Sequence, residues 1–276
     1  MYKILKKRTL SEQVKLMVID APLVAQKAQA GQFIILRVNE QGERIPLTIA
    51  DYDRDAGTVT IIFQEVGKTT MLLGALNEGD SLLDFVGPLG KASHFDSNVK
   101  KVAVIGGGLG TAIAYPQAKK LHAMGIDVTT VVGFRNKDLI LLEDEVRAVS
   151  SKLIVTTDDG SNGNKGFVTD ALKNEIESGE KFDLVIAIGP LVMMKFVSRL
   201  TKEYGIKTII SMNPIMIDGT GMCGGCRVTV GGKTKFACVD GPDFDGHEVD
   251  FDEAMRRQTM YKKQEGESCN LFEGVK

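Results

Sequence analysis

The stretch VAVIGGGLGTA, residues 102–112, determines how the middle of this chain folds. Residues 102–105 are apolar and mostly β-branched, as in a buried strand, and they pass directly into a glycine-rich turn. Such a turn between a strand and a helix offers backbone N–H groups and the positive end of a helix dipole to a pyrophosphate. The spacing is G-G-G-x-G rather than G-x-G-x-x-G, so the alternative is a tight turn that binds nothing. The candidate nucleotide-binding residues are Gly106, Gly107, Gly108, Gly110 and Thr111.

Strand-like and helix-like segments alternate around this stretch. The apolar, β-branched runs lie at residues 102–105, 128–132, 153–156, 184–188 and 208–210. Helix-like stretches such as 110–124, 139–149 and 192–204 lie between them. This alternation predicts an α/β domain with a five-stranded, parallel, doubly wound sheet.

The first 98 residues have a different pattern of predicted elements. Short β segments at 14–20, 32–38, 58–63 and 81–86 are separated by Gly, Asn and Asp turns, which predicts an antiparallel β-barrel. We therefore expect a β-barrel domain at 1–98, an α/β domain at 99–210 and a third region at 211–276. From Asp243 onward this third region is polar, and residues 250–262 have the pattern of one amphipathic helix. So polar a tail is expected to dock on a partner rather than on its own domain.

The third region contains DGTGMCGGCRVTVGGKTKFAC, residues 218–238. Cys223, Cys226 and Cys238 match the last three positions of a plant-type C-x₄-C-x₂-C…C iron–sulfur site, and Asp218 stands at the first. These four residues are the predicted metal ligands. The alternative is a structural zinc site completed by Asp218 or Cys269, although a second C-x₂-C or a His pair at zinc spacing is missing.

Composition limits the remaining classes of protein. The 276 residues are 43% hydrophobic and 25% charged, with a net charge of −2 and four cysteines. No basic block indicates a nucleic-acid partner, and no apolar run is long enough for a membrane span. Few cysteines and no signal-like start favour a protein of the reducing cytoplasm over a secreted disulfide scaffold.

Other candidates follow the predicted parallel strands, whose carboxyl ends form the edge where open α/β sheets bind ligands. Arg135 follows the second strand, where an acidic residue would indicate a ribose 2′-hydroxyl; an arginine there suits a 2′-phosphate. Asp158 follows the third strand and is either a cofactor-binding residue or part of a polar turn. The residues after the fourth strand are Gly189, Pro190, Met193 and Met194. Their alternative reading is a helix start with a methionine pair in the core.

Two motifs stand out in the barrel. One has Arg44 two residues before Pro46, Leu47 and Thr48, where rigid backbone can face a flat heterocycle. The other has Gly67, Lys68, Thr69 and Thr70, which offer donors and one positive charge to a pyrophosphate. The alternative for both motifs is an ordinary turn that binds no ligand.

In this order the motifs resemble the ferredoxin–NADP⁺ reductase superfamily, in the iron–sulfur branch that includes the dihydroorotate dehydrogenase electron-transfer subunit. The region from residue 217 is most similar to the family of small subunits of NADH-dependent reduced ferredoxin:NADP⁺ oxidoreductase, also known as sulfide dehydrogenase β subunits. The resemblance covers the whole chain. It implies FAD on the barrel, NAD(H) on the α/β domain and a [2Fe–2S] cluster on Asp218 and the three cysteines.

Carried over by position, the flavin motif R-P-[ILY]-[ST] falls on Ile45, Pro46, Leu47 and Thr48, with its arginine displaced by one to Arg44. The resemblance places Ile62, Phe63 and Gln64 along the flavin ring and Thr69 and Thr70 at its pyrophosphate. It places Met193 and Met194 near the nicotinamide. It implies no catalytic acid, base or nucleophile.

The resemblance further implies an oxidoreductase subunit that exchanges hydride between NAD(H) and FAD and passes single electrons through the cluster. The implied partner is a larger flavoprotein and iron–sulfur subunit in a heterodimer, where ferredoxin and NADP(H) react and electron bifurcation occurs. The alternatives are the electron-transfer subunit of dihydroorotate dehydrogenase, which has four cysteines in the cluster loop, and a zinc-stabilised binding module without redox activity.

Overall fold

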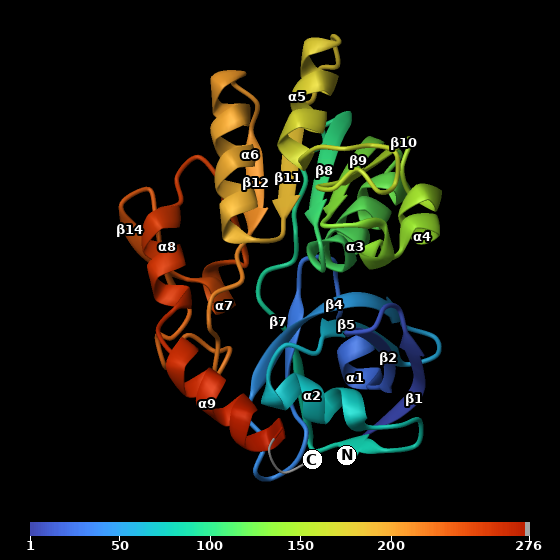
Figure 1. The fold of residues 1–276 in the computed structure, drawn as a ribbon, viewed down its shortest axis with the longest axis vertical. Coiled ribbons are helices and arrows are strands. Elements are labelled where there is room, and N and C mark those ends of the chain that lie inside the picture. The colour runs from blue at the N-terminus through green and yellow to red at the C-terminus, as the bar shows by residue number, and fades with distance from the viewer. Residues whose placement is uncertain (274–276) are drawn as a thin grey trace.

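The computed structural model describes the backbone of residues 1–273 and the side chains of residues 1–271. It consists of an antiparallel barrel, a mixed α/β sheet and a C-terminal part that lies against both (Figure 1). Within the described residues, no helix combines the length and the apolar character that a membrane span requires.

The barrel sheet is nearly closed, with its strands in the order β6-β1-β2-β5-β4-β3-β7 and every pairing antiparallel. Its elements are β1 (Tyr2–Thr9), β2 (Val14–Asp20), α1 (Pro22–Ala25), β3 (Phe33–Arg37), β4 (Ile45–Asp53), β5 (Thr58–Gln64), α2 (Lys68–Ala75), β6 (Ser81–Leu82) and β7 (Asp84–Leu89). The predicted barrel is confirmed. Sequence analysis missed β1, and it did not recognise that the motif around Pro46 is itself part of a strand.

The second sheet has the order β10-β9-β8-β11-β12-β15, in which the first five strands are parallel. Its strands are β8 (Lys101–Gly107), β9 (Asp127–Phe134), β10 (Lys152–Thr157), β11 (Leu184–Ile188), β12 (Thr208–Ser211) and β15 (Asp243–Asp245). Its helices are α3 (Gly110–Ala123), η1 (Lys137–Leu139), α4 (Glu143–Ala148), α5 (Val168–Glu177) and α6 (Leu191–Glu203). The predicted five-stranded parallel sheet is confirmed, and one antiparallel edge strand is added to it.

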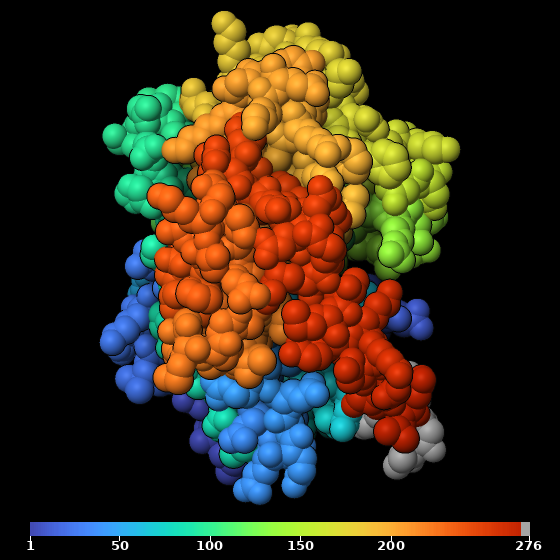
Figure 2. All heavy atoms as spheres, turned by 90° about the vertical axis from the view of Figure 1, so that its left-hand side faces the viewer, coloured from blue at the N-terminus to red at the C-terminus, as the bar shows by residue number. Residues whose placement is uncertain are grey.

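The rest of the C-terminal part comprises β13 (Arg227–Val230), β14 (Lys233–Phe236), α7 (Ala237–Asp240), α8 (Phe251–Gln258) and α9 (Lys262–Glu273). Figure 2 shows this part, in orange and red, spread over the α/β domain and reaching down to the barrel. β13 and β14 form a hairpin that directly follows the first two cysteines of the loop.

The expectation that the tail would stay clear of its own domain is wrong for residues 243–258. β15 pairs with β12, and Phe251 and Ala254 of α8 are buried in the core beneath α6. The Asp243 carboxylate accepts a hydrogen bond from Ser93 in the connection between barrel and sheet. Burial raises the pKa of this Asp243 carboxyl. The prediction relied on the small number of apolar residues in this segment. Two buried side chains and one strand pairing are nevertheless enough to anchor it.

The barrel and the α/β domain contact each other mainly through α3, which packs on β4. Lys119 on α3 forms an ion pair with Asp51 on β4 at 2.8 Å. Two residues earlier on α3, Gln117 donates a hydrogen bond to Ser93, the residue that also binds Asp243. These polar contacts align the two sheets so that the glycine-rich turn after β8 faces the barrel wall.

Candidate functional site

A cavity of about 1100 Å³ lies between the barrel and the carboxyl edge of the α/β sheet. β4 and β5 supply the barrel side, and the turns after the parallel strands supply the other. The predicted site residues that line it are Pro46, Leu47, Thr48, Ile62, Gln64, Gly107, Gly108, Gly110, Arg135, Asp158, Gly189, Pro190 and Met193. The structure therefore brings together residues from both predicted binding domains, which lie up to 147 positions apart.

The glycine-rich turn is held close to the turn after β11. A Cβ atom on Gly110 would lie 2.3 Å from the carbonyl oxygen of Ile188, and one on Gly107 would lie 2.5 Å from the sulfur of Met193. Only glycine permits this approach. At the start of α3 the N–H groups of Thr111 and Ala112 already donate to the carbonyls of Gly108 and Leu109. The cavity between this turn and the barrel is large enough for a dinucleotide.

Nine of the predicted cofactor-binding residues do not line the cavity, among them four buried residues on β5, β8, α3 and α6. Phe63 lies between Ile62 and Gln64 on β5, so strand alternation turns its ring into the barrel core, where it is fully buried. Met194 is one position past Met193 on α6 and packs into the core beneath the sheet. Gly106 and Thr111 are buried between the turn and the sheet. The side chains of Phe63 and Met194 therefore point away from the cavity.

The motif from Gly67 to Thr70 forms the N-terminal turn of α2, outside the cavity wall. The Thr70 hydroxyl accepts hydrogen bonds from the N–H groups of Val66 and Gly67, and Thr69 donates to the Glu43 carboxylate at 2.9 Å. The two hydroxyls are therefore already engaged, which leaves Lys68 and the first N–H groups of α2 to contact a pyrophosphate.

Arg44 also lies outside the cavity wall. Its Nε donates to the carbonyl of Ile217 at 3.1 Å, one residue before Asp218. The arginine thus ties the start of β4 to the loop that carries the cysteines. The contact joins residues 173 positions apart, so local sequence offers no signal for it.

The four predicted metal ligands lie in two pairs. The Cys226 and Cys238 sulfurs are buried and 3.2 Å apart, whereas Cys223 is exposed and its N–H donates to the Asp218 carboxylate at 2.8 Å. Positive-φ glycines at 219, 221 and 224 bend the backbone between these residues. Two pairs of anionic ligands in a tight loop suit a cluster with two iron atoms, because each iron takes two protein ligands.

The protonation of these groups follows their surroundings. Backbone N–H groups of Thr220 and Cys223 keep the pKa of the Asp218 carboxyl below its ordinary value, so this ligand is already charged. Burial raises the pKa of the Cys238 thiol to about 12, and the adjacent Cys226 contributes to the shift. Bound metal has to displace that proton, since the thiolate is the form that ligates.

Among the residues that the structure describes, no three His, Cys, Asp or Glu side chains gather as they would around one metal ion. Asp218, Cys223, Cys226 and Cys238 lie as the two pairs described above.

Two residues connect the large cavity to a small pocket behind the cysteine loop. This small pocket is lined by residues that include Gly225, and it shares Met212 and Pro214 with the large cavity. The segment after β12 lies at the carboxyl edge of the sheet, as do Asp158 and Gly189, and its cavity residues include Met212, Asn213, Pro214 and Met216. Sequence analysis missed this segment, although its position after the fifth parallel strand was a usable signal.

Comparison with protein families agrees with this division of the site. Residues 1–94 match the oxidoreductase FAD-binding domain, and residues 104–199 match the oxidoreductase NAD-binding domain. Residues 213–250 match the iron–sulfur cluster binding domain of dihydroorotate dehydrogenase B. FAD-binding, NAD-binding and iron–sulfur domains are thus all present, and the last match identifies the cysteine loop as an iron–sulfur domain rather than a zinc site.

Similar proteins cover the whole chain. An uncharacterized protein of the adh 3′ region in Clostridium beijerinckii is 55% identical over 97% of this chain and 93% of its own length. The dihydroorotate dehydrogenase B (NAD⁺) electron transfer subunit homolog of Thermotoga maritima is 48% identical over 98% of this chain and 95% of its own length.

Solved structures show the same relationship. A chain in the structure of NADH-dependent reduced ferredoxin-NADP oxidoreductase, studied for flavin-based electron bifurcation, is 47% identical. It superposes with a TM-score of 0.93 over 99% of this chain and 98% of that chain. Ferredoxin-NADP⁺ reductase from Plasmodium falciparum is 16% identical with a TM-score of 0.57, over 74% of this chain and 89% of that chain; this likeness shows a shared fold alone.

Proposed function

The chain belongs to the family of dihydroorotate dehydrogenase B electron-transfer subunits and their homologues, within the ferredoxin–NADP⁺ reductase superfamily. On this premise we propose that it is the electron-transfer subunit of an NADH-dependent, electron-bifurcating ferredoxin:NADP⁺ oxidoreductase. The similarity to a chain of NADH-dependent reduced ferredoxin-NADP oxidoreductase supports this choice. We also propose functional limits of 1–98, 99–210 and 211–276, with β15 as the strand that links the third region to the second.

One observation carries the proposal: Met212 and Pro214 line both the large cavity and the small pocket that Gly225 of the cysteine loop also lines. When bound, FAD supplies the exchange between hydride, which carries two electrons, and single electrons. The chain's own residues bind the two cofactors and orient them toward each other. In this proposal Pro46, Leu47 and Thr48 hold the flavin ring, and the turn at Gly107 and Gly110 positions the nicotinamide nucleotide against it.

The remaining predicted residues have supporting roles. Lys68 and the N-terminus of α2 hold the flavin pyrophosphate, and Pro190 and Met193 close the nicotinamide side of the cavity. Asp218, Cys223, Cys226 and Cys238 hold the [2Fe–2S] cluster. Because Cys223 is exposed while Cys226 and Cys238 are buried, the cluster would face solvent or a partner on the side of Asp218 and Cys223.

The proposed partner is a larger flavoprotein and iron–sulfur subunit on which ferredoxin and NADP(H) react. Four cysteines in this chain are too few for further clusters, so bifurcation belongs to the complex. Residues 243–258 pack on the chain itself, and α9 contacts α2 while most of its side chains stay exposed. The proposed docking surface is therefore the exposed side of α9 and of the cysteine loop. Ending the chain after Tyr261 should leave cofactor content unchanged and weaken co-purification of the larger subunit. Full co-purification would contradict this assignment.

The second candidate is the electron-transfer subunit of a dihydroorotate dehydrogenase. The match of the cysteine loop to that enzyme's cluster domain favours it. Asp218, which stands where that branch has a cysteine, speaks against it.

Anaerobic purification tests the proposal. We expect about one FAD and two iron atoms per chain, and reduction of the flavin by NADH. Zinc in place of iron in freshly isolated, active protein would contradict it. Co-expression with each type of larger subunit separates the two candidates by which complex forms.

A further inference from the structure

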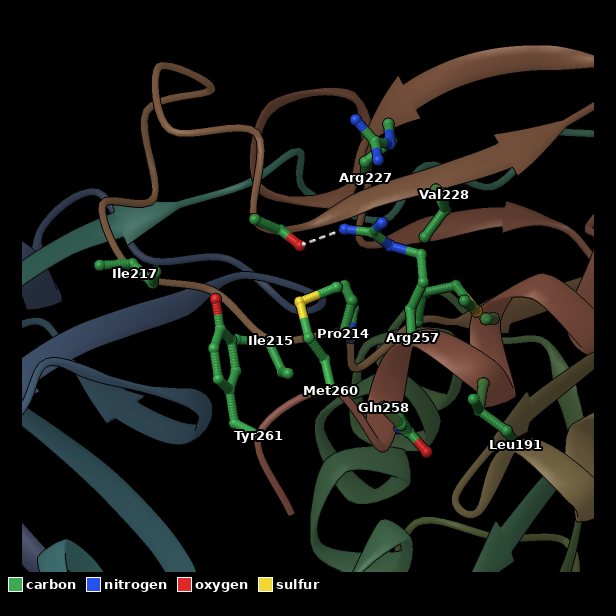
Figure 3. A pocket seen from close by; sticks show the side chains of 13 residues that line it. Leu191, Pro214, Ile215, Ile217, Arg227, Val228, Arg257, Gln258, Met260 and Tyr261 are labelled. Atoms are coloured by element: carbon green, nitrogen blue, oxygen red, sulfur yellow. Dashed lines mark hydrogen bonds between the residues drawn. The ribbon is translucent and has the colours of Figure 1, made fainter. Parts of the chain in front are cut away.

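The last turn of α8 contacts two parts of the site at once. Arg257 donates from Nη2 to the carbonyl oxygen of Gly225 in the cysteine loop, at 3.2 Å (Figure 3). The next residue, Gln258, donates to the backbone and side-chain oxygens of Asn213, at 3.4 and 3.3 Å. Asn213 lines the large cavity. A helix outside both sequence motifs thus fastens the loop to the cavity wall.

Gly225 is a sensitive position for such a contact. It lies between Cys223 and Cys226, and its N–H donates to the sulfur of Cys223 at 3.4 Å. Hydrogen bonds to ligand sulfurs, together with nearby charge and solvent exposure, set the potential of an iron–sulfur site. By holding the carbonyl of Gly225, Arg257 restrains the residue whose amide faces a ligand sulfur.

The surroundings of Arg257 strengthen the effect of its charge. The side chain is partly buried and extends from α8 toward the loop (Figure 3). Pro214, Ile215 and Met260 line the same small pocket. In such partly apolar surroundings a unit charge acts over a longer range than in bulk water. The four proposed ligands are all anionic when they bind iron, so this cation faces a site of negative charge.

We propose that Arg257 is a positioning residue that holds the cluster loop and, through its positive charge, favours the reduced cluster. The inference rests on the proposed [2Fe–2S] site. Reduction adds one electron to a centre already surrounded by anionic ligands, and a fixed guanidinium beside the loop offsets part of that added charge. Arg257 therefore raises the potential at which the cluster accepts an electron.

The test is an anaerobic redox titration followed by electron paramagnetic resonance on the whole chain, with the parent, Arg257→Gln, Arg257→Lys and Arg256→Gln. In Arg257→Gln the ratio of reduced to oxidised cluster at a fixed potential should fall about threefold to tenfold, since the charge is lost. Arg257→Lys keeps the charge and should restore most of that ratio. Arg256 is exposed on the same helix and outside the pocket wall, so Arg256→Gln is the matched control and should match the parent.

A full cluster in Arg257→Gln with the potential of the parent would overturn the proposal, as would an equal shift in Arg256→Gln. If Arg257→Gln assembles no cluster, Arg257→Lys decides: assembly with a near-parental potential supports the role of charge, and failure to assemble shows a packing role alone. A parent chain with no iron–sulfur signal would instead contradict the proposed function, so the two failures are distinguishable.

Discussion

The large cavity and the cysteine loop are built in opposite ways. The cavity is assembled from β4, β5 and the turns after five parallel strands, and it is lined largely by backbone and apolar side chains. The loop holds four anionic ligands within 21 consecutive residues, all supplied by side chains. A site that orients a large planar cofactor depends on the packing of two domains, whereas a site that ligates metal depends on a few irreplaceable atoms. Substitution of a buried cysteine should therefore remove the cluster outright, whereas substitutions in the cavity should weaken cofactor binding gradually.

The largest effect is expected from Cys226→Ser. Cys226 is buried next to Cys238, and a hydroxyl is a poor substitute for thiolate at iron, so we expect loss of most bound iron with FAD retained. Iron and flavin analysis of the purified variant measures both. Cys269→Ser is the matched control and should keep its iron. Loss of FAD together with iron would show that the two sites do not form independently.

Next in size is Gly110→Ala. Its added Cβ would lie 2.3 Å from the Ile188 carbonyl, so the turn has to move, at a cost of about 1–3 kcal/mol in unfolding free energy. We expect the Kd for NADH to rise about tenfold or more, with FAD and iron unchanged, as measured by flavin reduction and thermal unfolding. In Gly108→Ala the new Cβ meets open space, and only the left-handed φ of 55° is strained, so a smaller effect is expected. Equal effects would contradict the packing argument.

These two variants also show what sequence can and cannot reveal. The cysteine loop and the glycine-rich turn were predicted because each is contiguous and its spacing reflects local chemistry. The Arg44 contact with Ile217, the anchoring of β15 on β12 and the contact of Arg257 with Gly225 were not, because each joins segments far apart in the chain. The direction of the Phe63 side chain has a simpler explanation. Alternate residues of a strand face opposite sides, so Phe63 points into the core while Ile62 and Gln64 face the cavity, and the motif alone does not show this.

A moderate effect is expected from Asp218→Cys. The change restores a four-thiolate pattern, so a cluster should assemble, with a shifted potential because thiolate is a softer ligand than carboxylate. In Asp218→Ala the cluster should be lost more readily in air. Redox titration and the decay of visible absorbance measure the two properties. If both variants behave like the parent, Asp218 is not a ligand, and Cys269 becomes the candidate for the fourth position.

The smallest effect concerns the choice of nicotinamide cofactor. Arg135 and Asp158 both line the cavity at the ends of neighbouring strands, and we expect NADH to reduce the flavin faster than NADPH. Asp158→Asn removes a negative charge that repels a 2′-phosphate and should lower the ratio of the NADH rate to the NADPH rate a few-fold. Arg135→Ala should slow flavin reduction by NADPH more than reduction by NADH. Stopped-flow reduction with each cofactor decides. Faster reduction of the parent by NADPH would reverse the assignment.

The central claim is that electrons pass from the cavity to the cysteine loop within this one chain. The most direct measurement is to mix the anaerobic, isolated chain with NADH, freeze it, and record the electron paramagnetic resonance spectrum of the parent and of Cys226→Ser. The account predicts flavin reduction in both proteins and a reduced iron–sulfur signal in the parent alone. A parent with full iron and FAD content whose flavin is reduced while its cluster stays oxidised and can still be reduced by dithionite would contradict it.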